Sequence, residues 1–512
     1  MKRSLISAWW WALLLLVAVC ACQPDDDDDG NDDDTLDDDA ADDDSAADDD
    51  SDDDAPEPLY AAAGHVVLTP TAANHPEQIY LGGVFPSRLG SGVHDDLLGS
   101  ALALRQGETT IVLVSLDFLA FTRTRIREIQ ERLAAHGLAK ENILIASTHT
   151  HEAPDTLGVF GPNVLTSGVS PTYIAFVQDA VVNLVLEVVG RFEPVTVIAG
   201  KATINDPRSN EPTLAADLRY PHLSVDHLAY ARFDNAAGQT VATLVNWHTH
   251  PEVMIESTLV SADFPQWLRQ RVEEKLGGSC VYISGALGGL ITPTGVDVPA
   301  RDENGAPLTG PGGEPLYYRE GTWDKARSLG FVLADYALAD MASRQPVDEP
   351  RLRAVVREML LPVTNPIMLL AFYSGLLEFD RADVVTDHPE FCGFFGCTSE
   401  RIAVVEIGPV AITTSPGETF PETYLGREES SVDFEAPWGP FTFPAMDGLL
   451  AHLDAEVPMH VAECGNEVGY LIPRSDFHPR RHPDYYEEDL YFGKDTETIY
   501  RAAMIDLLDS LR

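Results

Sequence analysis

The residues best placed to do chemistry are two His-Thr-His strings. The first, His149-Thr150-His151, stands in "NILIASTHTHEAPD" (142–155), directly after an apolar run typical of a buried strand. The second, His248-Thr249-His250, follows a similar run in "LVNWHTHPE" (244–252). Neutral imidazole is the commonest metal ligand in proteins and also carries protons near neutral pH. Two such strings are hard to explain as separate core histidines, so they predict one shared metal or catalytic site.

Two strand–helix–strand units position these strings. In each unit an apolar strand precedes a segment with helical spacing and a second strand, which is the pattern of a parallel crossover. The first unit comprises residues 108–120, 122–137 and 142–148, and the second comprises 239–252, 263–277 and 279–289. The two units are not obvious sequence repeats. Ligands bind outside the carboxyl ends of strands in open α/β sheets, so each string lies where a site is expected.

The remaining segments predict an α/β fold. The predicted elements are a strand at 59–69, covering helices at 171–190 and 323–344, a hairpin at 401–418 and a Gly- and Pro-rich loop at 295–320. Asp263 is placed to cap the helix that follows it, and "GVHDD" (92–96) is typical of a structural turn. We predict a central, largely parallel or mixed sheet flanked by helices. Residues 58–512 would form a single large catalytic domain.

The first 22 residues have the pattern of a signal peptide. Lys2 and Arg3 precede a short apolar stretch that ends in Val19-Cys20-Ala21-Cys22, which is too short for a spanning helix. The segment resembles a bacterial lipoprotein signal, with Cys22 as the lipid-carrying residue. Gln23 after that cysteine suggests an outer-membrane lipoprotein facing the periplasm or the cell surface. The alternative is an ordinary cleaved signal without lipid.

An aspartate-rich segment follows the signal. Residues 25–54 contain 20 aspartates, and self-repulsion keeps such a segment extended. We therefore predict a disordered tether over residues 23–57. The formal net charge of the chain is −48, and subtracting those 20 charges leaves −28. An acidic surface of this kind argues against nucleic acid as a partner.

The cysteines exclude a zinc site built on thiolates. No CxxC pattern occurs, so any metal must be held by His, carboxylates or Tyr. An oxidising compartment permits disulfides, and we predict that Cys392 pairs with Cys397 in "CGFFGC". A bond between Cys280 and Cys464 is an open alternative.

Several short motifs resemble one family in their order and placement. "ASTHTHEAP", "LVNWHTHPE", "SADFP", "GALGG" and "TTSPGE" are similar to segments of the neutral/alkaline ceramidases and their relatives among bacterial lipoproteins. The resemblance runs from "GHVVLTP" to about "YYEE", and it implies a zinc amidohydrolase on an α/β domain. It implies that His149, His250, Glu418 and Tyr470 bind Zn²⁺, with His248 as the rival of His250.

The resemblance also implies the catalytic roles. His151 would act on the substrate or the attacking water, and Tyr486 matches a further family tyrosine. Two neutral imidazoles and one carboxylate leave zinc a net positive charge, which makes hydroxide available to attack an amide carbonyl. His151 could move the proton, and a phenol such as Tyr486 could stabilise the oxyanion.

The sequence departs from the family at several positions. Glu152 and Asp155 follow the first string where small residues are usual, which predicts a more acidic pocket mouth. "GGLITPTG" (288–295) lacks the family's Asp and Ser, with Thr292 as a partial substitute. The predicted function is zinc-dependent cleavage of an N-acyl amide bond in a lipid-like or small substrate, with the membrane reached through the N-terminal lipid. The alternatives are an ester or small acyl-amide hydrolase on the same fold, or a surface lipoprotein whose vestigial site only binds.

Overall fold

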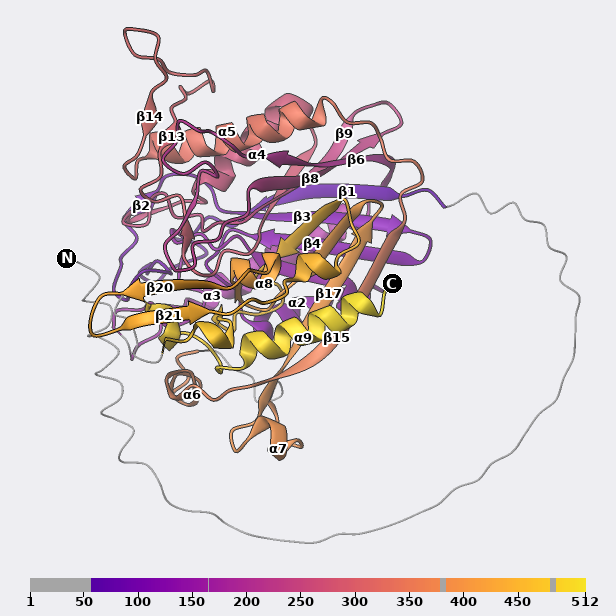
Figure 1. The fold of residues 1–512 in the computed structure, drawn as a ribbon. Coiled ribbons are helices and arrows are strands. Elements are labelled where there is room, and N and C mark those ends of the chain that lie inside the picture. Colours follow the sequence, from indigo (N-terminus) through magenta and orange to yellow (C-terminus); the bar gives the residue numbers. More distant parts are fainter. Residues whose placement is uncertain (1–56, 164, 378–383, 479–484) are drawn as a thin grey trace, which may run out of the picture. The chain divides into compact units, whose positions relative to one another are not determined.

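The computed structural model describes residues 57–163, 165–377, 384–478 and 485–512. Residues Pro58–Arg512 form one compact unit, and the fold is shown in Figure 1. The predicted signal peptide, Cys22 and nearly all of the predicted tether lie outside the described residues.

The largest sheet has eight strands, in the order β11-β9-β8-β6-β1-β3-β4-β5. It consists of two halves, because β6 and β1 are joined only where Tyr60 and Ala61 lie opposite Pro194 and Glu193. The first half contains β1 (Tyr60–Val67), β3 (Leu98–Gln106), β4 (Thr109–Leu116) and β5 (Ile143–Ser147). The second half contains β6 (Glu193–Thr203), β8 (His227–Asn235), β9 (Thr240–Trp247) and β11 (Ser279–Ser284).

The two halves have the same topology. In each, the first three strands pair antiparallel and the last two pair parallel. The parallel pairs are joined by α2 (Arg123–Ala134) in the first half and by α4 (Phe264–Leu276) in the second. Both predicted crossover units are thus confirmed, and the prediction of a mixed sheet flanked by helices is correct. The repeat itself is structural, since the sequences of the two halves gave no sign of it.

Alternating side chains divide each half between two cores. In the first half, Ala62, Val112 and Val114 pack with α2 and with α3 (Pro171–Val189), whereas Ala61 and Leu113 face the opposite way. In the second half, one face packs with α4 and with α5 (Trp323–Met341). The other face meets the first half, and β11 contacts β3, β4 and β5. The helices therefore lie outside, and the two half-sheets share an inner core.

A further sheet borders this inner core. It contains β15 (Leu352–Pro362), β17 (Cys397–Ile407), β18 (Val410–Thr414) and β22 (Val457–Val461), with β16 (Val384–Val385) on β17. The predicted hairpin at 401–418 is the antiparallel pair β17–β18, while β18 and β22 are parallel. Helix α9 (Thr496–Asp509) packs on β15.

The other elements are short. They are β2 (Gly92–Val93), β7 (Ala216–Asp217), β10 (Leu259–Val260), β12 (Ile291–Thr292), β13 (Val298–Pro299), β14 (Tyr317–Tyr318), β19 (Glu418–Thr419), β20 (Ser430–Phe434), β21 (Gly439–Phe443), β23 (Tyr470–Leu471), α6 (Pro366–Tyr373), α7 (Pro389–Cys392) and α8 (Pro421–Leu425). The predicted loop at 295–320 holds only the two-residue strands β13 and β14.

Helix α3 is the one described helix whose length and apolar composition would suit a membrane span. Its buried residues recur at helical spacing, and they pack on β1 and β3 in the first core. Amphipathic burial of this kind is typical of a core helix.

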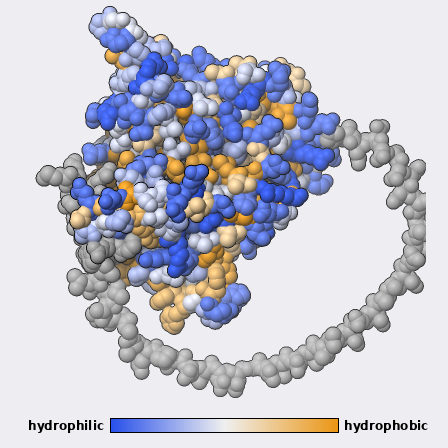
Figure 2. Space-filling model, viewed as in Figure 1, coloured by the Kyte–Doolittle hydropathy of each residue, from blue (hydrophilic) through white to orange (hydrophobic). Residues whose placement is uncertain are grey.

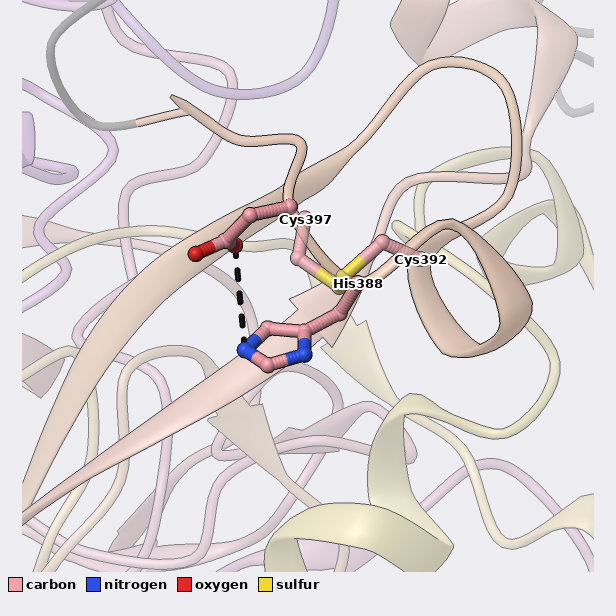
Figure 3. The surroundings of a disulfide bond; sticks show 4 residues. His388, Cys392 and Cys397 are labelled. Carbon is pink, nitrogen blue, oxygen red and sulfur yellow. Dashed lines mark ion pairs between the residues drawn. A yellow bond between two sulfur atoms is a disulfide. The ribbon is translucent and has the colours of Figure 1, made fainter. Parts of the chain in front are cut away.

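The predicted disulfide between Cys392 and Cys397 is present (Figure 3). Cys280 and Cys464 are both buried and free, so the alternative pairing between them is not formed.

Candidate metal centre

Three histidines from the two half-sheets meet in the interior. His149 follows β5 with a left-handed backbone (φ 67°), and its N–H donates to the carbonyl of Phe118 at 2.9 Å. His250 follows β9, and its N–H donates to the carbonyl of Ile291 at 3.0 Å. The ring centroids of His149, His151 and His250 lie 4.9 to 5.6 Å apart.

One nitrogen from each of these rings lies within 4.8 Å of the other two, so the three imidazoles form a group that could hold a metal ion. The carboxyl ends of the parallel strands, where the sequence predicted a binding site, therefore lie close together.

Hydrogen bonds to the backbone fix which nitrogen of His149 and His250 is available. Nδ1 of His149 lies 2.9 Å from the carbonyl oxygen of Leu119, and Nδ1 of His250 lies 2.9 Å from that of Ile291. A carbonyl only accepts, so each Nδ1 carries the proton and each neutral ring presents a bare Nε2. Both Nε2 atoms therefore have the tautomer that a metal ligand requires.

The carboxylate of Glu418 lies at both bare nitrogens. Its Oε2 is 3.2 Å from Nε2 of His250 and 3.8 Å from Nε2 of His149. Burial is the largest single influence on the pKa of His250 and lowers it, but the hydrogen bond with Glu418 and the charges of Glu252 and Glu418 together raise it overall. A buried carboxylate shared by two imidazoles favours positive charge between them, whether a proton or a metal ion supplies it.

His151 differs from its two neighbours. Neither of its ring nitrogens has a hydrogen-bond partner among the described residues, and the side chain is buried. Burial, together with His149 and His250, lowers its pKa well below the ordinary value. Gly83 packs on the ring so closely that a Cβ there would lie 2.6 Å from Nδ1. His151 is thus a neutral, unpartnered imidazole whose position depends on a glycine.

Two tyrosines lie next to Glu418. Strands β19 and β23 pair in parallel and place Tyr470 opposite Glu418. The hydroxyl of Tyr470 lies 3.2 Å from that of Tyr486. Burial raises the pKa of both phenols well above the ordinary value, so both are neutral and able to donate a hydrogen bond.

His248 lies outside the histidine cluster. Its ring stacks on Tyr424 at 4.9 Å, and its Nδ1 accepts the N–H of Ala286 at 2.9 Å. Of the two rivals in the second string, His250 is therefore the one beside His149 and Glu418.

Three further acids near the cluster were not among the predicted site residues. Glu463 contacts Nδ1 of His149, and with Glu467 these residues form a second group with metal-ligating atoms. Oε2 of Glu252 lies 3.8 Å from Nδ1 of His151. Burial raises the pKa of all three acids. One sequence feature could have identified two of them: Glu463 and Glu467 follow the buried strand β22, as the histidines follow β5 and β9.

The prediction of an acidic pocket mouth at Glu152 and Asp155 is wrong. Asp155 is buried and accepts the backbone N–H groups of Leu157, Gly158 and Phe160, so it holds a turn. Glu152 is fully buried and bonds the hydroxyl of Thr150. Both carboxyls satisfy interior polar groups instead of facing solvent.

Other singled-out residues have structural contacts. Asp263 caps α4 as predicted, accepting the N–H of Phe264. Asp95 in the predicted turn accepts from the hydroxyl of Ser261 and the N–H of Ala262. Thr292 hydrogen-bonds Glu252, so it reaches the edge of the site.

Comparison with solved structures gives the same fold. The chain matches the crystal structure of neutral ceramidase from Pseudomonas aeruginosa with a TM-score of 0.62 and 14% identity, over 89% of this chain and 74% of that one. It matches a ceramidase complexed with C2 with a TM-score of 0.62 and 15% identity, over 89% and 75%. No family model and no curated protein matches the sequence. The resemblance predicted from the motifs is therefore confirmed at the level of the fold.

Proposed function

We propose that this protein is a zinc-dependent hydrolase that cleaves an N-acyl amide bond in a lipid-like or small substrate. The observation that carries the proposal is the placement of Glu418 between the bare Nε2 atoms of His149 and His250, on a fold shared with neutral ceramidases.

The donor set fits zinc. His149, His250 and Glu418 supply two neutral imidazoles and one carboxylate, which is a common set for catalytic zinc. Tyr470, paired with Glu418, is the proposed fourth ligand. Leu119, Ile291 and Glu463 would orient the imidazoles through Nδ1, as outer partners of metal-bound histidines do. A zinc ion held there would activate water and polarise the amide carbonyl.

The remaining groups have separate tasks. His151 is neutral and unpartnered, so it can take a proton from water and return it to the leaving amine. Tyr486 is a neutral phenol next to Tyr470 and can donate to the oxygen that gains charge as the carbonyl is attacked. Burial of the whole cluster strengthens each of these interactions.

The experiment is metal analysis of the purified protein, followed by a panel of N-acyl amides and the matched esters. We expect about one zinc per chain and hydrolysis of amides. Stoichiometric zinc with cleavage of esters alone would replace the amidase assignment by an esterase. A folded protein without bound metal would indicate the vestigial binding site.

We further propose that lipid on Cys22 anchors the protein to the outer membrane. The support is the sequence "VCACQ" and the acidic segment after it. In the Cys22→Ser variant we expect release from the membrane or failure of processing. A wild-type N-terminus without lipid, found by mass spectrometry, would contradict the anchor.

A further inference from the structure

Four exposed aromatic side chains gather on α6, α7 and the loop after α7. Tyr373 is 68% exposed, Phe391 49%, Phe394 93% and Phe395 44%. The ring centroids of Tyr373 and Phe395 lie 6.0 Å apart, and those of Phe394 and Phe395 lie 5.1 Å apart. Figure 2 shows hydrophobic surface at the lower edge of the molecule, where Figure 1 places α6 and α7. We call these four residues the aromatic patch.

The chain holds the patch at the surface by covalent and backbone constraints. The Cys392–Cys397 disulfide closes the loop that carries Phe394 and Phe395 (Figure 3), and both cysteines are buried. Gly393 and Gly396 flank the two phenylalanines with φ values of 68° and 85°, a conformation that glycine adopts without strain. A Cβ on Gly396 would lie 2.7 Å from Val384. The loop therefore packs closely on β16 while its aromatic rings stay exposed.

The inner side of α6 borders a cavity. Phe372 precedes Tyr373 and lines a cavity together with Leu157, Leu377, Phe492 and Glu467. Glu467 belongs to the acidic pair that reaches His149. Tyr373, the one residue of the aromatic patch on α6, is therefore exposed next to a residue that faces this cavity.

Size and charge decide which partner fits the patch. Four side chains offer far less than the roughly 1,000 Å² that a stable protein interface requires. Aromatic rings on a projecting loop are suited to the boundary between headgroups and acyl chains. The charged neighbours Asp387 and Glu390 are acidic and exposed, so an anionic lipid surface is repelled. A zwitterionic surface of phosphatidylcholine presents quaternary ammonium groups, which carboxylates and aromatic faces both attract.

We propose that the aromatic patch docks the protein on a zwitterionic lipid surface, beside the cavity lined by Phe372 and Glu467. Docking itself stands on the patch, whereas its role in taking a lipid-like substrate from the bilayer rests on the proposed function.

The test is flotation of the full chain with phosphatidylcholine vesicles, using Cys22→Ser as the background so that no attached lipid contributes. We expect this protein to float with the vesicles, and binding to weaken when phosphatidylglycerol is added. Combining Tyr373→Ser, Phe394→Ser and Phe395→Ser should reduce binding by about tenfold or more, from the apolar burial of two phenylalanines alone.

Two variants control for folding and for general surface hydrophobicity. Phe394→Ser alone, at a side chain 93% exposed, leaves the core intact and should still weaken binding. Leu316→Ser removes an apolar side chain that is 43% exposed near β14, at the opposite end of the molecule in Figure 1, and should leave binding unchanged. Equal vesicle binding by the triple variant and its parent would overturn the proposal. So would a dimer, seen by sedimentation, that the triple variant loses while neither protein binds vesicles.

Hydrolysis separates this proposal from the proposed function. The triple variant should cleave a water-soluble, short-chain N-acyl amide at the parent rate and cleave the same bond in a vesicle-embedded amide more slowly. If the parent cleaves no N-acyl amide at all, the proposed function fails, and flotation still decides whether the patch docks.

Discussion

The two half-sheets share one topology and differ in the residues that stand at the ends of their strands. In the first half the histidines come after β5, the last strand, and Asp117 comes after β4. In the second half the order is reversed, because His250 comes after β9, which corresponds to β4, and Gly285 comes after β11, which corresponds to β5. The strand topology is repeated and the positions of the site residues are not, so neither half contains the candidate site by itself.

The ends of β4 and β11 carry no histidine of the cluster, and they support the ends of the other strands. Asp117 makes a bidentate ion pair with Arg269 of α4 at 2.9 and 2.7 Å, which links the two halves. After β11, Gly288 lies so close to the next segment that a Cβ would be 2.6 Å from the carbonyl of Glu418. The end of β4 thus joins the halves, and the segment after β11 makes room for the backbone of Glu418.

The largest expected effect comes from replacing the metal-site histidine of either half, His149 in the first or His250 in the second. His149→Ala and His250→Ala should each lose stoichiometric metal and activity together, because each removes one of two imidazoles at Glu418. His248→Gln, from the same string as His250, should retain metal. Metal content and turnover of the folded variants decide this. Loss of metal in His248→Gln with retention in His250→Ala would reverse the assignment.

His151→Ala should separate proton transfer from metal binding. We expect retained metal and a rate reduced by about 10² to 10⁴, the usual contribution of a positioned acid–base group. The measurement is metal content alongside turnover of a substrate that the wild type cleaves. Because His151 belongs to the three-histidine group, loss of metal equal to that in His149→Ala would make all three histidines ligands.

Breaking the ion pair between the halves should destabilise the fold. Asp117→Leu leaves the buried guanidinium of Arg269 without its partner, and we expect the free energy of unfolding to fall by about 3–5 kcal/mol. Adding Arg269→Met should restore much of this loss, because it removes the uncompensated charge. Urea unfolding of both variants provides the measurement, and equal stabilities for the single and double variants would refute the link.

The last prediction is a change in the pH dependence of stability, and it concerns the caps of the two crossover helices. Asp263 caps α4, and burial raises its pKa to about 7 from an ordinary 3.8. Between these values the folded carboxyl keeps a proton that the unfolded chain releases, so its contribution makes stability fall as pH rises from about 4 to about 7, by up to about 1.4 kcal/mol per pH unit.

Asp263→Asn should flatten that slope, because the amide does not titrate. Thr122, at the N-cap of α2, has no titratable group, and Thr122→Ser should leave the slope unchanged. Urea unfolding at several pH values measures both slopes. An unaltered slope in Asp263→Asn would show that another group is responsible.

The sequence revealed local structure well and long-range arrangement poorly. The boundaries of both crossover units and of the hairpin followed from apolar periodicity and turn residues, which act within a few residues. The motifs also placed the first string and Glu418 near a common site. Periodicity does not encode how the two half-sheets face each other, so the structural repeat was not visible. Glu152 and Asp155 were misplaced because a charged residue after a strand is usually solvated, whereas backbone N–H groups and Thr150 accommodate these two inside.

His250 and Glu418 are 168 residues apart in sequence, yet Nε2 of His250 lies 3.2 Å from Oε2 of Glu418 in the folded chain. Closing so long a loop is slow and entropically costly, and it depends on the earlier sheets having formed. Metal held by these two residues would therefore be acquired late in folding, and it would stabilise only chains that had completed it. Misfolded chains would then bind no metal, so they would remain less stable and more exposed to proteolysis.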